Sequence, residues 1–316
     1  MRVESYDYHI NHKNKKQSLN KQQTITHKTY HNSQLSIFNS QPICPNRITK
    51  NKNYMKTRHF LLVVALLLAG LQTTTAQCKY RNTAVKPGEF LSYNLYYNWQ
   101  FVWMKAGTAS MSVVKSNYHG KPALRMALIT RTSETLDKMF VMRDTLLCYN
   151  TLDLEPLYYR KGAREGKRYT VDEAFYSYSN NHQHVKLHRQ KNNGEHVWNE
   201  FNRTACAYDM MSIFLRARSF NPESWKKGKR IHIPITDGPK IINAILEYKG
   251  KTTVKADNGV KYRCLQLSYI ENEGNKEKEI TRFYVTDDVH HVPVRLDMFL
   301  KFGVAKAFLS GMKGVK

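Results

Sequence analysis

The sequence predicts a mainly β protein, in which a single antiparallel sheet, curved or rolled into an open, flattened barrel, surrounds one central helix. Segments that alternate polar and apolar residues recur about a dozen times after residue 87. Short turns containing Gly, Asn and Asp separate them, as in sheets built from hairpins. One stretch, about residues 208–218, has helical periodicity instead.

The first 76 residues are expected to lie outside this sheet. Residues 1–54 are rich in Asn, Gln, Lys, His, Ser and Thr and carry no sustained periodicity, which indicates a non-native or disordered extension. Residues 55–76 have the order of a signal peptide: basic Lys56–His59, an apolar run from Phe60 to Leu71, and small residues before a cleavage point. The alternative, an uncleaved anchor helix, is disfavoured because a membrane span needs about 20 apolar residues.

Cleavage is predicted after Ala76, and Met55 is the expected translation start. Cys78 follows closely, but Gln77 precedes it where lipid attachment would need a small residue, so ordinary cleavage and a soluble product are expected. We therefore predict a periplasmic protein. The single β-rich domain would occupy residues 77–316, which is 316 less 76, or 240 residues.

The expected mature chain is strongly basic. The whole chain has 50 Lys and Arg and 25 Asp and Glu, of which residues 1–76 hold 11 and 2, leaving 39 against 23 and a formal charge of +16. This charge favours anionic partners such as lipid head groups, lipopolysaccharide or acidic glycans. Among anionic partners, nucleic acid is not expected for an exported protein. A basic surface that only aids solubility is the plain alternative.

The cysteines leave their pairing open. Cys44 falls in the extension, and four cysteines remain: Cys78, Cys148, Cys206 and Cys264. Four cysteines in an oxidising compartment allow three connectivities. Cys148 and Cys264 lie in strand-like segments, so buried free thiols fit these two as well.

Strands are predicted on both sides of the helix. A bend at Lys105–Thr108 interrupts the second strand, and Thr132–Phe140 forms a short helical turn or lid. The hairpins at 149–158 and 283–296 each have an acidic turn and a Pro at the start of the returning strand. This similarity indicates either an internal sequence repeat or the same type of hairpin occurring twice. The predicted strands are Phe90–Tyr97, Phe101–Tyr118, Ala123–Arg131, Asp144–Asn150, Tyr169–Tyr178, His182–Arg189, His196–Asn202, Lys229–Ile235, Lys240–Tyr248, Lys251–Ala256, Lys261–Glu271, Glu279–Thr286, Pro293–Phe299 and Val304–Leu309.

The central helix has clear end signals. Asp209 is the expected N-cap, Arg216 and Arg218 suit the C-terminal end of the helix dipole, and Asn221-Pro222 ends the segment. Its apolar face is predicted from the spacing i, i+3, i+4, i+7 to be Met210, Ile213, Phe214 and Ala217.

Seven short motifs stand in order along the predicted domain: Gly88–Tyr93, Trp103–Ala109, Leu154–Pro156, Tyr208–Ser212, Thr286–Asp288, Pro293–Arg295 and Gly303–Ala305. Together these motifs resemble those of a bacterial exported family, the domain of unknown function 3108. The resemblance covers most of residues 87–309. It implies an envelope location and a mostly antiparallel β fold, and it supplies no established activity. The plan is also similar to the half-barrels of lipoprotein carriers, by architectural analogy alone.

No catalytic residue, metal site or cofactor is predicted. The chain lacks a nucleophile elbow, a zinc-protease helix, a phosphate loop and a dinucleotide-binding loop. His182, His184 and His188 could hold a metal, but a solvated hairpin explains them better. Among the acids, Asp209 is expected to cap the helix and Asp144 to point inward as a polar anchor.

The function predicted is a non-catalytic binding, carrier or chaperone-like role for an amphiphilic or anionic ligand. Membrane contact would be peripheral at most. A structural or interaction module of an envelope assembly is the alternative, and a hydrolase is the weakest hypothesis. An open cavity between sheet and helix would favour a ligand, and a helix packed tightly into the sheet would favour a scaffold. The predicted ligand-binding residues are Met210, Ile213, Phe214, Tyr93, Trp103 and Lys105.

Overall fold

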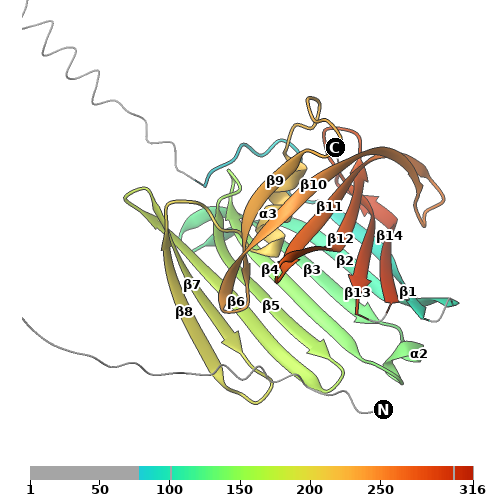
Figure 1. Ribbon diagram of the computed structural model, residues 1–316, viewed down its shortest axis with the longest axis horizontal. Coiled ribbons are helices and arrows are strands. Elements are labelled where there is room, and N and C mark those ends of the chain that lie inside the picture. The colour runs from blue at the N-terminus through green and yellow to red at the C-terminus, as the bar shows by residue number, and fades with distance from the viewer. Residues whose placement is uncertain (1–77, 100–101, 302, 316) are drawn as a thin grey trace, which may run out of the picture. The chain divides into compact units, whose positions relative to one another are not determined.

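The computed structural model describes residues 78–99, 102–301 and 303–315 (Figure 1). The predicted extension (1–54) and signal peptide (55–76) lie outside these residues and stay predictions. The described elements are β1 (Phe90–Trp99), β2 (Val102–Tyr118), β3 (Lys121–Thr132), α2 (Glu134–Asp137), β4 (Met142–Thr151), β5 (Pro156–Glu165), β6 (Arg168–Ser179), β7 (His182–Gln190), β8 (His196–Arg203), α3 (Met210–Arg218), β9 (Arg230–Asp237), β10 (Lys240–Lys255), β11 (Lys261–Glu273), β12 (Lys276–Thr286), β13 (Pro293–Leu300) and β14 (Gly303–Lys313).

The strands form one 14-stranded antiparallel sheet in the order β8-β7-β6-β5-β4-β3-β2-β1-β14-β13-β12-β11-β10-β9. Apart from the pairing of β1 with β14, every pairing joins two strands that are consecutive in the chain, so the sheet is built of successive hairpins. Its edge strands, β8 and β9, are consecutive in the chain and are joined through α3. The sheet remains open along this seam, which confirms the predicted mainly β, single-sheet fold.

Alternation along each strand places apolar side chains on the face that packs against α3. In β1, Leu91, Tyr93 and Leu95 are buried, whereas the intervening residues are half-buried. Such side chains form two apolar clusters. The larger draws mainly on β1–β7 and includes Met126 and Leu187, and the smaller draws on β9–β12 and includes Ile233 and Leu265. Both contact α3, which is drawn against the sheet in Figure 1.

The predicted bend in the second strand is confirmed. In the pairing of β1 with β2, Leu95 pairs with Gly107 and the next residue, Tyr96, pairs with Lys105, so the register shifts between these two pairs. A Cβ atom on Gly107 would lie only 2.0 Å from the carbonyl oxygen of Arg131, so the close approach of β3 requires glycine here. The helical turn predicted after β3 is also present as α2, capped by Ser133.

One pair of predicted strands is wrong. Lys240–Tyr248 and Lys251–Ala256 were expected to be separate strands with a turn between them, but β10 runs continuously from Lys240 to Lys255. Gly250, with φ of +110°, produces a bulge in the pairing with β11. Within the residues that the structure describes, neither helix has the length and apolar character needed to cross a bilayer.

Candidate functional site: a groove beside the helix

Helix α3 begins at a buried acidic cap, as predicted. The Asp209 carboxylate accepts hydrogen bonds from the backbone N–H groups of Met211 (3.0 Å) and Ser212 (2.8 Å) and from the Ser212 hydroxyl (2.6 Å). Burial raises the pKa of Asp209 to about 6, and the hydrogen bonds oppose that shift. Because Asp209 and Ser212 are both 0% exposed, the pair supports the fold and is closed to a substrate.

The predicted apolar face of the helix is right at Ile213, Phe214 and Ala217, which pack against the apolar clusters, and wrong at Met210. Met210 is 55% exposed, whereas Met211 and Leu215 are buried in the larger cluster. On another side of the helix, Ile213 and Ala217 pack against the smaller cluster. The sheet thus covers α3 from two sides, and a single stripe at i, i+3, i+4 and i+7 does not describe a helix enclosed in this way.

The C-terminal end of α3 is held by a buried ion pair. Arg218 donates to both carboxylate oxygens of Glu89, at 2.5 and 2.9 Å, and each side chain is 2% exposed. Its guanidinium also donates to the carbonyl oxygen of His290, at 2.9 and 3.1 Å. The helix is therefore tied to the residue preceding β1 and to the turn between β12 and β13.

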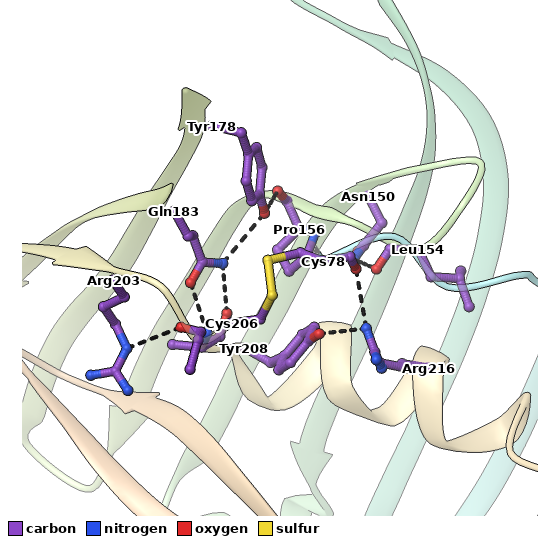
Figure 2. Close-up of a disulfide and its surroundings, with 12 residues drawn as sticks. Cys78, Asn150, Leu154, Pro156, Tyr178, Gln183, Arg203, Cys206, Tyr208 and Arg216 are labelled. Atoms are coloured by element: carbon purple, nitrogen blue, oxygen red, sulfur yellow. Dashed lines mark hydrogen bonds between the residues drawn. A yellow bond between two sulfur atoms is a disulfide. The ribbon is translucent and has the colours of Figure 1, made fainter. Parts of the chain in front are cut away.

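A disulfide ties the segment before β1 to the segment before α3. Cys78 and Cys206 are bonded with their Cα atoms 5.7 Å apart, while Cys148 and Cys264 are buried free thiols (Figure 2). This settles the connectivity that the sequence left open. The Gln183 amide holds the same region, donating to the carbonyl oxygen of Ala207 (2.9 Å) and accepting from its N–H group (2.7 Å).

Arg216 lies on the side of α3 facing the disulfide. Its guanidinium sits over the rings of Tyr80 and Tyr208, 4.6 and 4.9 Å from their centroids. It donates to the Cys78 carbonyl oxygen at 3.1 Å and to the Tyr208 hydroxyl (Figure 2). These contacts hold a cation at a fixed position between two aromatic rings.

An open groove of about 720 Å³ adjoins this cation. It runs between α3, β9 and the segments on either side of the helix. Its lining mixes aromatic and aliphatic side chains with polar groups, among which Arg216 and His232 are the basic ones. The lining residues are Tyr80, Thr204, Ala205, Cys206, Tyr208, Ile213, Arg216, Phe220, Asn221, Trp225, Ile231, His232, Ile233 and Pro234.

The six residues predicted to bind a ligand do not come together. Ile213 lines the groove, whereas the ring of Phe214 packs near Phe283, with centroids 6.3 Å apart. Tyr93 is buried in the larger cluster and donates to the Pro293 carbonyl oxygen at 3.0 Å. Burial raises its pKa strongly.

Trp103 and Lys105 lie elsewhere. Trp103 pairs with Asn98, and Lys105 pairs with Tyr96. The side chains of Asn98 and Tyr96 point to one face of β1, and the side chain of Tyr93 points to the other face. The Lys306 ammonium lies 4.2 Å from the centroid of the Trp103 ring. With Met210 exposed at the start of α3, the predicted set is spread over the helix, the core and the outer face.

The other polar candidates do not line the groove, although His182 lines an adjacent pocket together with Thr204 and Ala205, which both line the groove. His188 contacts Glu173 at 2.8 Å and His196 at 2.7 Å, while His182 and His184 contact the neighbouring turn. Asp144 shares the inner face of β4 with buried Leu146, and burial raises its pKa. This placement agrees with its predicted inward orientation.

Sequence reasoning missed most of the groove. Arg216 was assigned only to the helix dipole, and Tyr80, Phe220 and Trp225 were not considered. An available signal was the aromatic content of the segments flanking Cys78 and the end of the helix. Such irregular segments have no periodicity, so their side chains cannot be assigned to a face.

Fold and site define the class: an open antiparallel β-sheet protein with an enclosed helix and an aromatic groove beside it. The chain belongs to the family described as protein of unknown function (DUF3108), which matches residues 92–310. No curated protein matches it. A solved structure of a beta-barrel-like protein of domain of unknown function DUF1849 from Brucella abortus is similar over 73% of this chain and 98% of its own, with 10% identity and a TM-score of 0.48.

Proposed function

We propose that the protein is a non-catalytic binding protein of the cell envelope that holds a small amphiphilic anion in the groove beside α3. The observation that carries this proposal is Arg216, fixed against Tyr80 and Tyr208 at the side of a groove lined by both apolar and polar groups. Ligand sites combine mostly apolar linings with a few placed polar groups, and a guanidinium suits a carboxylate or phosphate.

The location of the ligand differs from the sequence hypothesis, which placed it between helix and sheet. Met211 and Leu215 fill that space, so the proposed ligand lies on another side of the helix. The Cys78–Cys206 disulfide supports export, because such bonds persist mainly in oxidising compartments. Periplasmic location after cleavage behind Ala76 is part of this proposal.

A binding titration tests the groove. The probe is 1-anilinonaphthalene-8-sulfonate, an aromatic anion whose fluorescence rises in apolar surroundings. We expect saturable binding that Arg216→Gln weakens at least about tenfold, by loss of a charge-assisted contact. Arg125→Gln, at an exposed position on β3, is the matched control and should bind as the wild type does. Equal affinity in Arg216→Gln and wild type would refute the proposed site.

The natural ligand can be sought in the same protein. Native mass spectrometry of material purified from the periplasm should show a bound small molecule, and organic extraction should release it. Absence of any copurifying molecule, together with no saturable probe binding, would remove the binding hypothesis.

The alternative function, an interaction module, has one observation in its favour. In the described part of the chain, β8 pairs with β7 alone, and Trp198 on β8 is 48% exposed. An unpaired strand edge can accept a strand from another protein. Crosslinking through a photoreactive residue at position 198 would detect such a partner, and stable protein adducts without bound ligand would favour this alternative.

A further inference from the structure

The hairpin topology gathers alternate connections at one end of the sheet. The connections β1–β2, β3–β4, β5–β6 and β13–β14 all fall at the end opposite the β12–β13 turn. Asn98 pairs with Trp103 on β2 and with Val304 on β14, so the first and last of these hairpins are neighbours. Figure 1 shows α2 near the same end as the β1–β2 hairpin.

Six large apolar side chains at this end face solvent. They are between 45% and 64% exposed, and all lie at or next to a connection. We call this set the apolar rim: Val102, Trp103, Met139, Phe140, Tyr169 and Leu300.

Two of the connections that carry the rim, β3–β4 and β5–β6, touch each other. The Gly166 N–H in the β5–β6 turn donates to the Val141 carbonyl oxygen at 2.7 Å. A Cβ atom on Gly166 would meet the Phe140 ring at 3.4 Å. The β3–β4 and β5–β6 connections therefore form one surface, and contiguous exposed apolar surface of this kind marks an interaction site.

Basic side chains surround the rim. Exposed Lys and Arg outnumber exposed carboxylates in these connections and the adjoining strand ends, where Glu134 and Glu165 are exposed and Asp137 is half-buried against Arg143. Turns and strand ends at the opposite end mix the acids Asp153, Asp257 and Asp288 with the exposed lysines Lys121, Lys255 and Lys261. The exposed basic residues are Lys105, Arg131, Lys138, Arg164, Lys167 and Arg168.

We propose that the apolar rim docks the protein on the surface of an anionic lipid bilayer. Apolar and aromatic side chains on projecting hairpins can enter the head-group region, where Trp and Tyr are favoured. The surrounding Lys and Arg match the negative surface of such a bilayer, and their attraction is screened by salt. None of the six rim residues is among the described residues that line the groove, so this proposal is independent of the proposed ligand.

Cosedimentation with vesicles tests the proposal on protein purified after expression of the full chain. One set of vesicles contains phosphatidylcholine alone, and the other contains equal parts of phosphatidylcholine and phosphatidylglycerol. We expect binding to the anionic vesicles that weakens as salt is raised, and at least about tenfold weaker binding to the neutral ones. Equal binding to both, or to neither, would overturn the proposal.

Two sets of variants distinguish docking through the rim from non-specific adsorption to vesicles. Trp103→Ser with Phe140→Ser and Leu300→Ser should weaken binding to anionic vesicles more than about tenfold. The control carries the same number of serine substitutions at the other end, where side chains are 47% to 70% exposed: Leu152→Ser, Val260→Ser and Val289→Ser. Wild-type binding in the rim variant, or equal loss in the control, would refute the rim as the docking surface.

The charge contribution has its own test. Lys138→Gln, Lys167→Gln and Arg168→Gln together should weaken binding about 100-fold and flatten the salt dependence. Lys121→Gln, Lys255→Gln and Lys261→Gln remove the same charge from the opposite end and should have less than a tenth of that effect. A thermal melt of each variant checks that these exposed substitutions leave folding intact, and equal effects of the two sets would contradict docking through this end.

Discussion

Replacing Arg218 by methionine should destabilise the protein more than any other single change at the helix. The substitution removes two bonds to Glu89 and two to the His290 carbonyl oxygen, and it leaves a carboxylate that is 2% exposed without its cation. Breaking a buried ion pair by removing one partner costs about 3–5 kcal/mol. A domain is stabilised by about 5–15 kcal/mol in total, so Arg218→Met should remove about a fifth or more of the stability.

Urea denaturation measures this loss, and a double-mutant cycle assigns it. Glu89→Gln in the Arg218→Met background removes the unpaired charge and should recover about 2 kcal/mol. Arg125→Met, at an exposed position, is the control and should change stability by less than about 0.5 kcal/mol. A loss under about 1 kcal/mol for Arg218→Met, or no recovery in the double variant, would refute the argument that the buried charge needs its partner.

The remaining predictions concern the cap, the disulfide and the seam of the sheet. Burial raises the pKa of Asp209 in the folded state from 3.8 to about 6, so the folded state binds this proton more tightly than the unfolded state does. The free energy of unfolding should therefore fall by about 3 kcal/mol as the pH rises from about 4 to 6. Asp209→Asn should abolish this pH dependence in denaturation measured across the same range. Reducing Cys78–Cys206, which closes a separation of 128 residues, should cost about 2–4 kcal/mol in urea denaturation with and without reductant, and an unchanged midpoint would contradict this. Gly238→Ala should lower the melting temperature more than Gly259→Ala, since both have positive φ but only the first places a Cβ against a neighbouring guanidinium, at 2.3 Å; equal shifts would exclude the steric contact.

The strands and the start of the helix could be predicted because their signals are local. Alternating residues in β1 and the Asp209 cap specify structure from a few neighbouring positions. Gly250 shows the limit of local signals, because a glycine in a strand-like segment fits a bulge as well as a turn. Here the bulge lets β10 continue, and two predicted strands become one.

The rotation of α3 and the site beside it depend on contacts between distant segments. Arg218 meets Glu89 across 129 positions, and Cys78 meets Cys206 across 128, so no spacing rule connects them. The groove combines residues before β1 with residues after the helix. Only the curvature of the whole sheet determines which side of the helix it covers, and therefore whether Met210 or Met211 is buried.

The positions of the two proposed surfaces restrict how they could work together. The groove adjoins α3 and Cys206, whereas the apolar rim lies at the β1–β2 and β13–β14 hairpins. A ten-residue strand such as β5 spans about 33 Å, so a protein docked through the rim holds its groove beyond the head-group region of that bilayer. A ligand of the groove must then arrive through solvent or from a second surface, because lipid in the docked bilayer cannot reach Arg216. Vesicle binding should consequently survive Arg216→Gln, and probe binding should survive loss of the rim.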